Sequence, residues 1–179
     1  MDEAGVPEPS LDEILTAARA RAYSGQFALE EEEALPMVVV LLDGLPFGIA
    51  GGPAKEIVAS PRITPVPGAP GVIRGVILLR GEVEAVVDLR CVLGLAPSEL
   101  RDAARVVMVE GQALRAGLLV DAVEDVTEVP GGELKPSVAS FDDRLRRLAG
   151  GTFHYHGRDT VVLDVERILS EALDAGGAA

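Results

Sequence analysis

Two apolar runs on either side of a two-residue turn constrain the fold of this chain more than any other feature. Residues 76–79 and 83–87 are rich in β-branched side chains, and Arg80-Gly81 lies between them. Such runs favour strands, and a short turn with glycine between them is typical of a β-hairpin. Asp88 follows the second run and precedes a short apolar stretch, where it is suited to cap a helix. The sequence therefore predicts a hairpin followed by a capped helix.

The rest of the chain repeats this pattern of short apolar runs and turns. Strands are expected over residues 37–42, 47–49, 105–110, 113–120, 123–129, 148–155 and 160–163. Residues 54–58 could form either a helical or an extended piece. Asp164 should cap a closing helix whose apolar face contains Val165, Ile168, Leu169 and Leu173. Many short strands with glycine and proline turns favour closed or nearly closed barrels over a parallel sheet.

The first 35 residues differ in character from the remainder. Ser10 and Glu13 fit a capping box, and the following apolar residues share one face of a short helix: Leu11, Ile14, Leu15 and Ala18. Four consecutive glutamates come after it. We therefore expect residues 1–35 to be a flexible extension that is dispensable for folding, and residues 36–179 to form the globular domain.

Composition excludes several classes of partner. The net charge is −13, so phosphate backbones and anionic lipid surfaces should be repelled. One cysteine cannot form an internal disulfide, and the N-terminus has neither the basic nor the apolar segment of a signal peptide. No apolar run approaches the length of a membrane span. These observations favour a cytoplasmic protein.

Several segments together resemble the signature of the CheW family, the coupling proteins of bacterial chemotaxis arrays. The similarity covers residues 37–169 and rests on Phe47-Gly48-Ile49, Lys55-Glu56-Ile57, Pro67, Pro70, Gly75, Leu79-Arg80-Gly81, Asp88-Leu89-Arg90, 116–123 and Leu163-Asp164. Two residues depart from it, because Leu78 replaces the usual asparagine and Ala85 the usual proline. Residues 51–53 are also an unusual insert.

The resemblance implies an all-β fold with short helices, in which two small five-stranded SH3-like barrels pack on a shared core. We expect the first barrel to include residues 37–42 and the hairpin around Arg80, and the second to include residues 105–129.

The resemblance also implies a function. The chain is expected to be a non-enzymatic adaptor that couples the regulatory domain of a CheA-type histidine kinase to the cytoplasmic tip of chemoreceptors. It would be a monomer in solution, recruited to receptor arrays at the inner membrane, without membrane insertion, nucleic-acid binding or a cofactor. Coupling in a pilus-motility or developmental pathway is an alternative, and so is a stand-alone peptide-binding barrel.

Arg80 is the central residue of the expected binding site. An arginine fork suits a carboxylate, and Glu56 is the best candidate to pair with it at the rim of a groove that receives a receptor helix. The residues expected to bind receptor or kinase are Lys55, Glu56, Ile57, Val76, Arg80 and Gly81. Those expected to be structural are Pro70, Gly75, Asp88 and Leu89.

A competing hypothesis is an enzyme that uses Asp88 or a histidine pair. His154 and His156 alternate along an expected strand, so both should face one side. A metal site needs further ligands, however, and the chain has no other histidine. Cys91 lies in an apolar helix, where we expect its side chain to be buried and to act as a small hydrophobic residue. We therefore expect neither a metal nor a catalytic residue.

Overall fold

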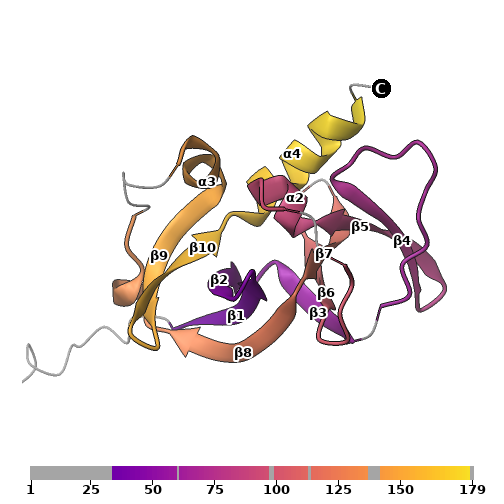
Figure 1. Ribbon diagram of the computed structural model, residues 1–179. Coiled ribbons are helices and arrows are strands. Elements are labelled where there is room, and N and C mark those ends of the chain that lie inside the picture. Colours follow the sequence, from indigo (N-terminus) through magenta and orange to yellow (C-terminus); the bar gives the residue numbers. More distant parts are fainter. Residues whose placement is uncertain (1–33, 60, 97–98, 113, 137–141, 178–179) are drawn as a thin grey trace, which may run out of the picture. The chain divides into compact units, whose positions relative to one another are not determined.

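The computed structural model describes residues 34–59, 61–96, 99–112, 114–136 and 142–177. The chain divides into two units, Met1–Glu33 and Ala34–Ala179. The helix predicted after Ser10 and most of the extension lie outside the described residues, so both stay predictions. The second unit contains all the elements described below, and Figure 1 shows their arrangement.

Ten strands form two five-stranded sheets. Sheet A has the order β8 (Ala122–Val129), β1 (Leu35–Leu42), β2 (Leu45–Ala50), β10 (Arg158–Leu163), β9 (Ala149–Tyr155). Sheet B has the order β3 (Ala54–Ala59), β6 (Arg105–Glu110), β7 (Arg115–Val120), β5 (Glu82–Asp88), β4 (Ile73–Leu79). Residues 54–58 are thus a strand, which resolves the ambiguity that the sequence left.

Each sheet closes on itself through one extra bridge. Thr64, which follows edge strand β3, pairs with Val76 of the opposite edge strand β4. In sheet A, Lys135 follows β8 and pairs in the same way with Thr152 of β9. Because these bridges join the two edges, the sheets are barrels A and B, and the predicted fold class is confirmed.

The two halves of the chain have the same topology. Residues 35–93 run through β1–β5 into helix α2 (Leu89–Leu93), and residues 105–177 run through β6–β10 into helix α4 (Val165–Gly177). In both halves the first two strands are antiparallel neighbours, and the second strand lies parallel to the last strand of the other half.

The halves exchange their first two strands. Barrel A joins β1–β2 to β8–β10, whereas barrel B joins β6–β7 to β3–β5. The expected assignment of residues 37–42 and the Arg80 hairpin to one barrel is therefore wrong, and residues 105–129 are divided between both barrels. The physical reason is that the chain crosses from one barrel to the other after β2 and again after β7.

Three hairpin turns follow one local rule. Each has two residues with positive φ, at Asp43-Gly44, Arg80-Gly81 and His156-Gly157. This is the type I′ geometry, whose twist matches that of the flanking strands and which requires glycine or another tolerant residue. The turn predicted at Arg80-Gly81 is confirmed.

Three apolar clusters stabilise the unit. One fills each barrel, around Met37 and Phe153 in barrel A and around Ile77 and Met108 in barrel B. The third and largest lies between the barrels and takes the other face of β1, with Val38 and Val40. Strand β1 is therefore buried on both faces, which explains its nearly continuous apolar sequence.

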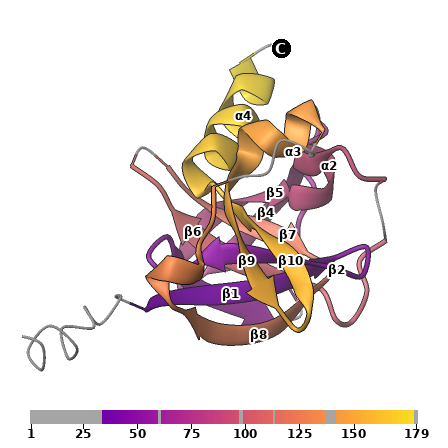
Figure 2. The same cartoon turned by 90° about the vertical axis from the view of Figure 1, so that its left-hand side faces the viewer.

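Three helices gather on one side of this unit, as Figures 1 and 2 both show. The short helix α3 (Asp143–Leu148) was not predicted, because its sequence Asp-Arg-Leu-Arg-Arg-Leu has little apolar periodicity. In α4, Val165, Ile168 and Leu169 are buried as predicted. Leu173 is exposed and Ala172 is buried in its place, so that part of the predicted face is wrong. A 3-10 turn, η1 (Gly131–Glu133), is the remaining helical element of the residues that the structure describes.

Candidate functional site

Arg80 and Glu56 form an ion pair at one end of barrel B. The Arg80 Nη2 atom lies 3.1 Å from Glu56 Oε1, although the residues belong to a hairpin turn and to strand β3. This confirms the predicted contact. The Arg80 side chain remains 76% exposed. Most of its guanidinium donors therefore face solvent, where they can meet a partner's carboxylate.

Further ion pairs surround this end of the barrel. Lys55 Nζ lies 3.8 Å from Glu110, and Arg115 Nε lies 3.2 Å from Glu84. Because these residues come from β3, β5, β6 and β7, the pairs ring the barrel mouth. We call the following set the charged rim: Lys55, Glu56, Arg80, Glu82, Glu84, Glu110 and Arg115. The Arg80–Glu56 and Lys55–Glu110 pairs are largely exposed and add little stability, whereas Glu84 is buried beneath Arg115. The exposed members of the rim are therefore available for recognition.

The other predicted binding residues lie on strands β3 and β4 or in the turn. Lys55 and Ile57 are exposed on β3, Val76 is half-buried on β4, and Gly81 completes the type I′ turn with φ +90°. Lys55 also donates to the Gly52 carbonyl at 2.9 Å.

The predicted structural residues have identifiable roles. Asp88 accepts hydrogen bonds from the Arg90 and Cys91 amides at 3.0 and 3.3 Å, which confirms it as the cap of α2. Leu89 is fully buried. A Cβ on Gly75 would clash with the Thr64 carbonyl, so Gly75 permits barrel closure. The Pro70 carbonyl accepts a bond from the Ile73 amide where β4 begins.

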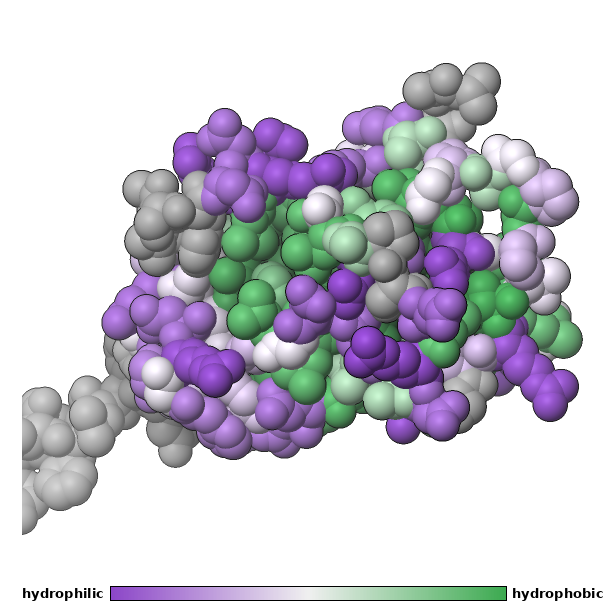
Figure 3. Space-filling model, in the orientation of Figure 1, coloured by the Kyte–Doolittle hydropathy of each residue, from purple (hydrophilic) through white to green (hydrophobic). Residues whose placement is uncertain are grey.

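Sequence reasoning missed an apolar surface beside the charged rim. Leu78 and Val83 are cross-strand partners in the β4–β5 hairpin, and they are 73% and 69% exposed. Figure 3 shows apolar surface over these strands at the right of the molecule. The available signal was the departure at Leu78, where the family signature has asparagine.

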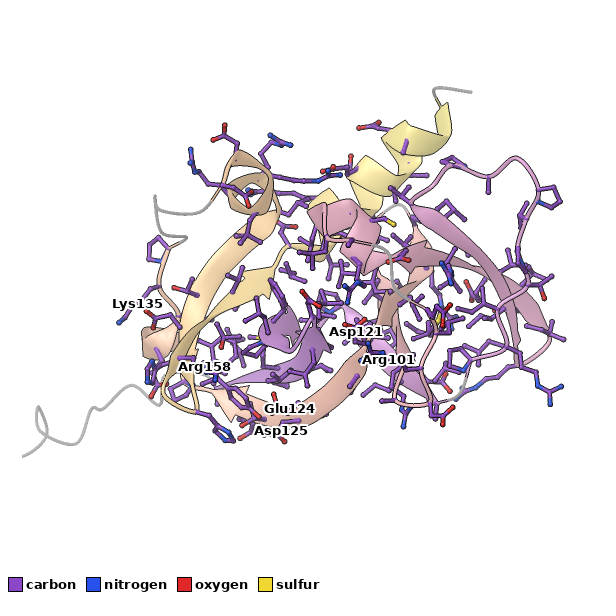
Figure 4. All side chains as sticks on the ribbon, in the orientation of Figure 1. Arg101, Asp121, Glu124, Asp125, Lys135 and Arg158 are labelled. Atoms are coloured by element: carbon purple, nitrogen blue, oxygen red, sulfur yellow. The ribbon has the colours of Figure 1, made fainter. Side chains whose placement is uncertain are left out.

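A buried arginine network was also missed. Arg90, whose side chain is only 10% exposed, binds Asp121 at 2.6 Å and Asp43 at 3.4 Å. Its Nε donates to the Ala96 carbonyl at 2.7 Å. Because Asp43 lies in the β1–β2 turn and Asp121 in the β7–β8 crossover, one side chain ties both to α2. Figure 4 shows Asp121 in the middle of the unit, where the two barrels meet.

The histidines do not form a pair. His154 lies on β9 and its Nδ1 is 3.3 Å from Asp159, whereas His156 lies in the turn with φ +46°. The expectation that both face one side is wrong, because β9 ends at Tyr155 and the turn redirects the chain. Within the described residues, no group of three or more histidine, cysteine, aspartate or glutamate side chains could hold a metal ion.

Two side chains have raised pKa values. Burial raises the pKa of Tyr155. The nearby Asp125, which accepts a hydrogen bond from the Tyr155 hydroxyl at 3.3 Å, adds to the effect. Figure 4 shows Asp125, Glu124 and Arg158 close to one another on barrel A. Burial also raises the pKa of the Cys91 thiol, with Asp88 contributing. Cys91 is only partly buried, less than expected from its apolar helix.

The cavity beside Asp88 bears on the enzyme hypothesis. Its lining includes the charged residues Asp88, Arg90 and Asp121 and the apolar residues Leu100 and Leu119, and its volume is about 20 Å³. That space holds about one water molecule, so an organic substrate does not fit. Asp88 also caps helix α2, so its carboxylate already accepts hydrogen bonds from backbone amides.

Among the described residues no helix is both long and apolar enough to cross a membrane.

Comparisons with known proteins agree with this architecture. A family model described as CheW-like domain matches residues 36–173. The probable chemotaxis protein CheW of Rhizobium etli is 34% identical over 65% of this chain and 76% of its own length. Protein PilI of Pseudomonas aeruginosa is 32% identical over 58% of each chain.

A solved structure has the same fold. The scaffolding protein TtCheW of Thermoanaerobacter tengcongensis superposes with a TM-score of 0.66 and 26% identity, over 74% of this chain and 90% of its own. With the family model covering most of the sequence and this fold in common, the chain belongs to the CheW-like domain family.

Proposed function

We propose that this chain is a non-enzymatic adaptor that couples a CheA-type histidine kinase to chemoreceptors in a signalling array. The observation that carries the proposal is the Arg80–Glu56 ion pair, formed by two family-matching residues on an exposed barrel mouth. Names of its relatives support the role, since several are chemotaxis proteins and one is a scaffolding protein. The site of action would be the cytoplasmic side of receptor arrays at the inner membrane.

The proposed docking residues are those of the barrel B mouth. Arg80 and Glu56 would present one cation and one anion in fixed geometry, and Lys55, Ile57, Val76 and Gly81 would surround them. An ion pair that holds both side chains in place reduces the conformational entropy lost on binding. The partners would be the tip of a receptor and the regulatory domain of the kinase, each on its own surface.

A second candidate is coupling in a pathway other than flagellar chemotaxis, such as pilus motility. It is favoured by the similarity to Protein PilI. Both candidates require the same surfaces, so they differ only in the identity of the kinase and receptor. Capturing both partners from native cells with this protein as bait distinguishes them.

A reconstitution with three components tests the adaptor function. The protein is mixed with a kinase regulatory domain and a receptor cytoplasmic fragment, and complexes are measured by sedimentation. Individual affinities should be on the order of micromolar, with array avidity supplying the rest. A ternary complex is expected, because separate surfaces should not compete. Displacement of the kinase by saturating receptor fragment, or binding to neither, would rule the function out.

Charge reversal tests the docking residues within that assay. Arg80→Glu should weaken receptor binding about tenfold or more. The double variant Arg80→Glu with Glu56→Arg should restore part of it if the pair acts by its geometry. Arg158→Glu is the matched control, since Arg158 is an exposed arginine beside the corresponding turn of barrel A. Equal loss in the control would contradict a specific role for Arg80.

A further inference from the structure

We propose that the outer face of the β4–β5 hairpin docks an acidic amphipathic helix of a partner protein. This apolar hairpin face consists of Val76, Leu78, Val83 and Ala85. The inference rests on the proposed adaptor function and deepens it, because it names the chemistry of one docking partner and adds Leu78, Val83 and Ala85 to the surface.

Register places these four side chains on one face. Leu78 pairs with Val83, and Val76 pairs with Ala85. Partners in an antiparallel pair point to the same side, and residues two apart in a strand do so as well. The intervening residues Ile77 and Glu84 pair with each other, point the other way and are buried, as is Val86, the next residue on that face. The four residues therefore form a continuous apolar patch on the outside of the barrel.

The fold does not require apolar residues at the end of this hairpin. In β5, Val87 is buried in the core between the barrels, whereas Val83 projects beyond it. The corresponding pair in barrel A, also two positions from a type I′ turn, is His154 and Asp159. The same backbone position therefore accepts a polar pair. Leu78 and Val83 are thus explained by an interaction rather than by folding.

The charges beside the patch indicate the sign of the partner. Arg80 lies at the hairpin tip with its guanidinium mostly exposed. Thr64 pairs with Val76 in antiparallel register, so Arg62, two residues earlier, lies toward Leu78. Arg62 is exposed, and no ion pair joins it to a carboxylate of the described residues. Arg80 already pairs with Glu56, and the exposed Glu82 at the same tip pairs with Arg115, so Arg62 is the cation that these pairs leave over beside the patch. In a chain of net charge −13, a positive charge at this position favours a partner that carries carboxylates.

The dimensions of the patch suit one helix. Its two residue pairs are separated by about 7 Å along the strands, since each strand residue advances about 3.4 Å. Apolar residues at positions i and i+4 of a helix are about 6 Å apart, which matches this spacing. An added strand is disfavoured at Val76, because both of its edge-facing backbone groups already bond to Thr64.

A peptide titration tests the proposal. The probe is a synthetic helical peptide with leucines at i, i+4 and i+7 and glutamates on both sides of that stripe. One control peptide has lysine for every glutamate, and a second has glutamine for every leucine. Binding to the full chain is followed by fluorescence anisotropy and by NMR shifts of the Leu78 and Val83 methyl groups. We expect the acidic peptide alone to bind and to shift these methyl signals.

Protein variants locate the site. Leu78→His with Val83→Asp grafts the barrel A pair onto barrel B and should weaken peptide binding at least tenfold. The matched control is Val126→Asp, because Val126 is also an exposed strand valine but lies in barrel A. Circular dichroism and an unfolding curve show whether each variant is folded. If the graft fails to fold, Leu78→Asn, which restores the residue of the family signature, replaces it.

Three results would overturn the proposal. They are equal binding of the lysine peptide, unchanged affinity in the folded graft, and concentration-dependent self-association through Leu78, which would make a second copy the occupant. The adaptor function is judged separately in the three-component assay. If one of these three results is found and the graft still forms a normal ternary complex, that function stays intact and only this inference is removed.

Discussion

The two halves of the molecule share a topology but differ in the residues at equivalent positions. Both close a barrel with one bridge at a glycine, Gly75 beside Thr64 and Gly151 beside Lys135. Both place an aspartate before the final helix, Asp88 and Asp164. These shared features are the ones that the fold requires.

The differences lie at the hairpin tips and at the start of the helices. Leu78 and Val83 in barrel B correspond to His154 and Asp159 in barrel A. Two residues after the capping aspartate, Arg90 in one half corresponds to Glu166 in the other. Arg90 reaches the β1–β2 turn, and Glu166 accepts a bond from the Gln112 amide in the β6–β7 turn at 2.7 Å. We therefore expect binding residues at the hairpin tips, where exposed residues of the two halves differ.

Substitutions of Gly75 and Gly151, the glycines beside the bridges that close the barrels, should give the largest difference in stability between the two halves. Gly75→Ala should destabilise the protein by about 3 kcal/mol, because Gly75 has φ +149° and an added Cβ meets the Thr64 carbonyl. Gly151→Ala should cost about half as much, since only the contact with the Lys135 carbonyl is affected. Urea unfolding of both variants measures this difference. Equal losses would show that backbone strain at Gly75 is negligible.

Substitutions of Arg90 and Glu166 should give the second-largest difference in the free energy of unfolding. Arg90→Met removes a buried cation from two carboxylates and should cost about 2 kcal/mol. Glu166→Gln affects an exposed side chain with one backbone bond and should cost less than about 0.5 kcal/mol. Thermal unfolding at two salt concentrations checks both, and a similar effect of the two substitutions would contradict a central role for Arg90.

The helix caps provide a smaller contrast. Asp88→Ala should cost about 1–2 kcal/mol, because the buried carboxylate accepts two amide bonds. Asp164→Ala should cost about 1 kcal/mol, since Asp164 caps through one amide, that of Arg167, at 3.2 Å. Asn variants at both positions serve as controls, because asparagine also caps helices. Denaturant midpoints that rank the two caps in the opposite order would be inconsistent with this account.

The tips should have the smallest effect on stability. Arg80→Ala should change the free energy of unfolding by no more than about 0.5 kcal/mol, because exposed ion pairs contribute little. His156→Ala, at the corresponding turn position of barrel A, should have a similarly small effect. Calorimetry of both variants, paired with the receptor-binding assay, tests the separation of function from stability. A loss of several kcal/mol at Arg80 would place it among the structural residues instead.

Local features of this fold could be predicted from the sequence, but the exchange of strands could not. Arg80-Gly81 specifies a turn, and Asp88 before an apolar stretch specifies a cap, because both depend on neighbouring residues alone. Strand β1 is apolar on both faces, so its sequence does not determine which sheet it joins. The partners of Arg90 are 31 and 47 residues away, and no local pattern marks them.

The candidate site was predictable only in part. The contact between Arg80 and Glu56 followed from the family resemblance together with the chemistry of guanidinium and carboxylate groups. The exposure of Leu78 and Val83 was not predicted, because an apolar strand residue is expected to be buried unless its neighbours are known. Their alternation with Ile77 and Glu84 was present in the sequence, but which face points outward depends on the closed barrel.

The exchange of strands also sets an order in which the chain can acquire structure during synthesis. Every strand of barrel B lies within residues 54–120, so that barrel needs none of the strands β8–β10 in order to close. Strands β1 and β2 are made first, yet their partners β8 and β10 come last. On the ribosome, this apolar hairpin must wait while roughly 70 further residues are added, at about 5–20 residues per second, before β8 arrives. A translational pause or a chaperone that shields this hairpin would therefore delay the closure of barrel A directly, and would reach barrel B only through the apolar cluster that the two barrels share.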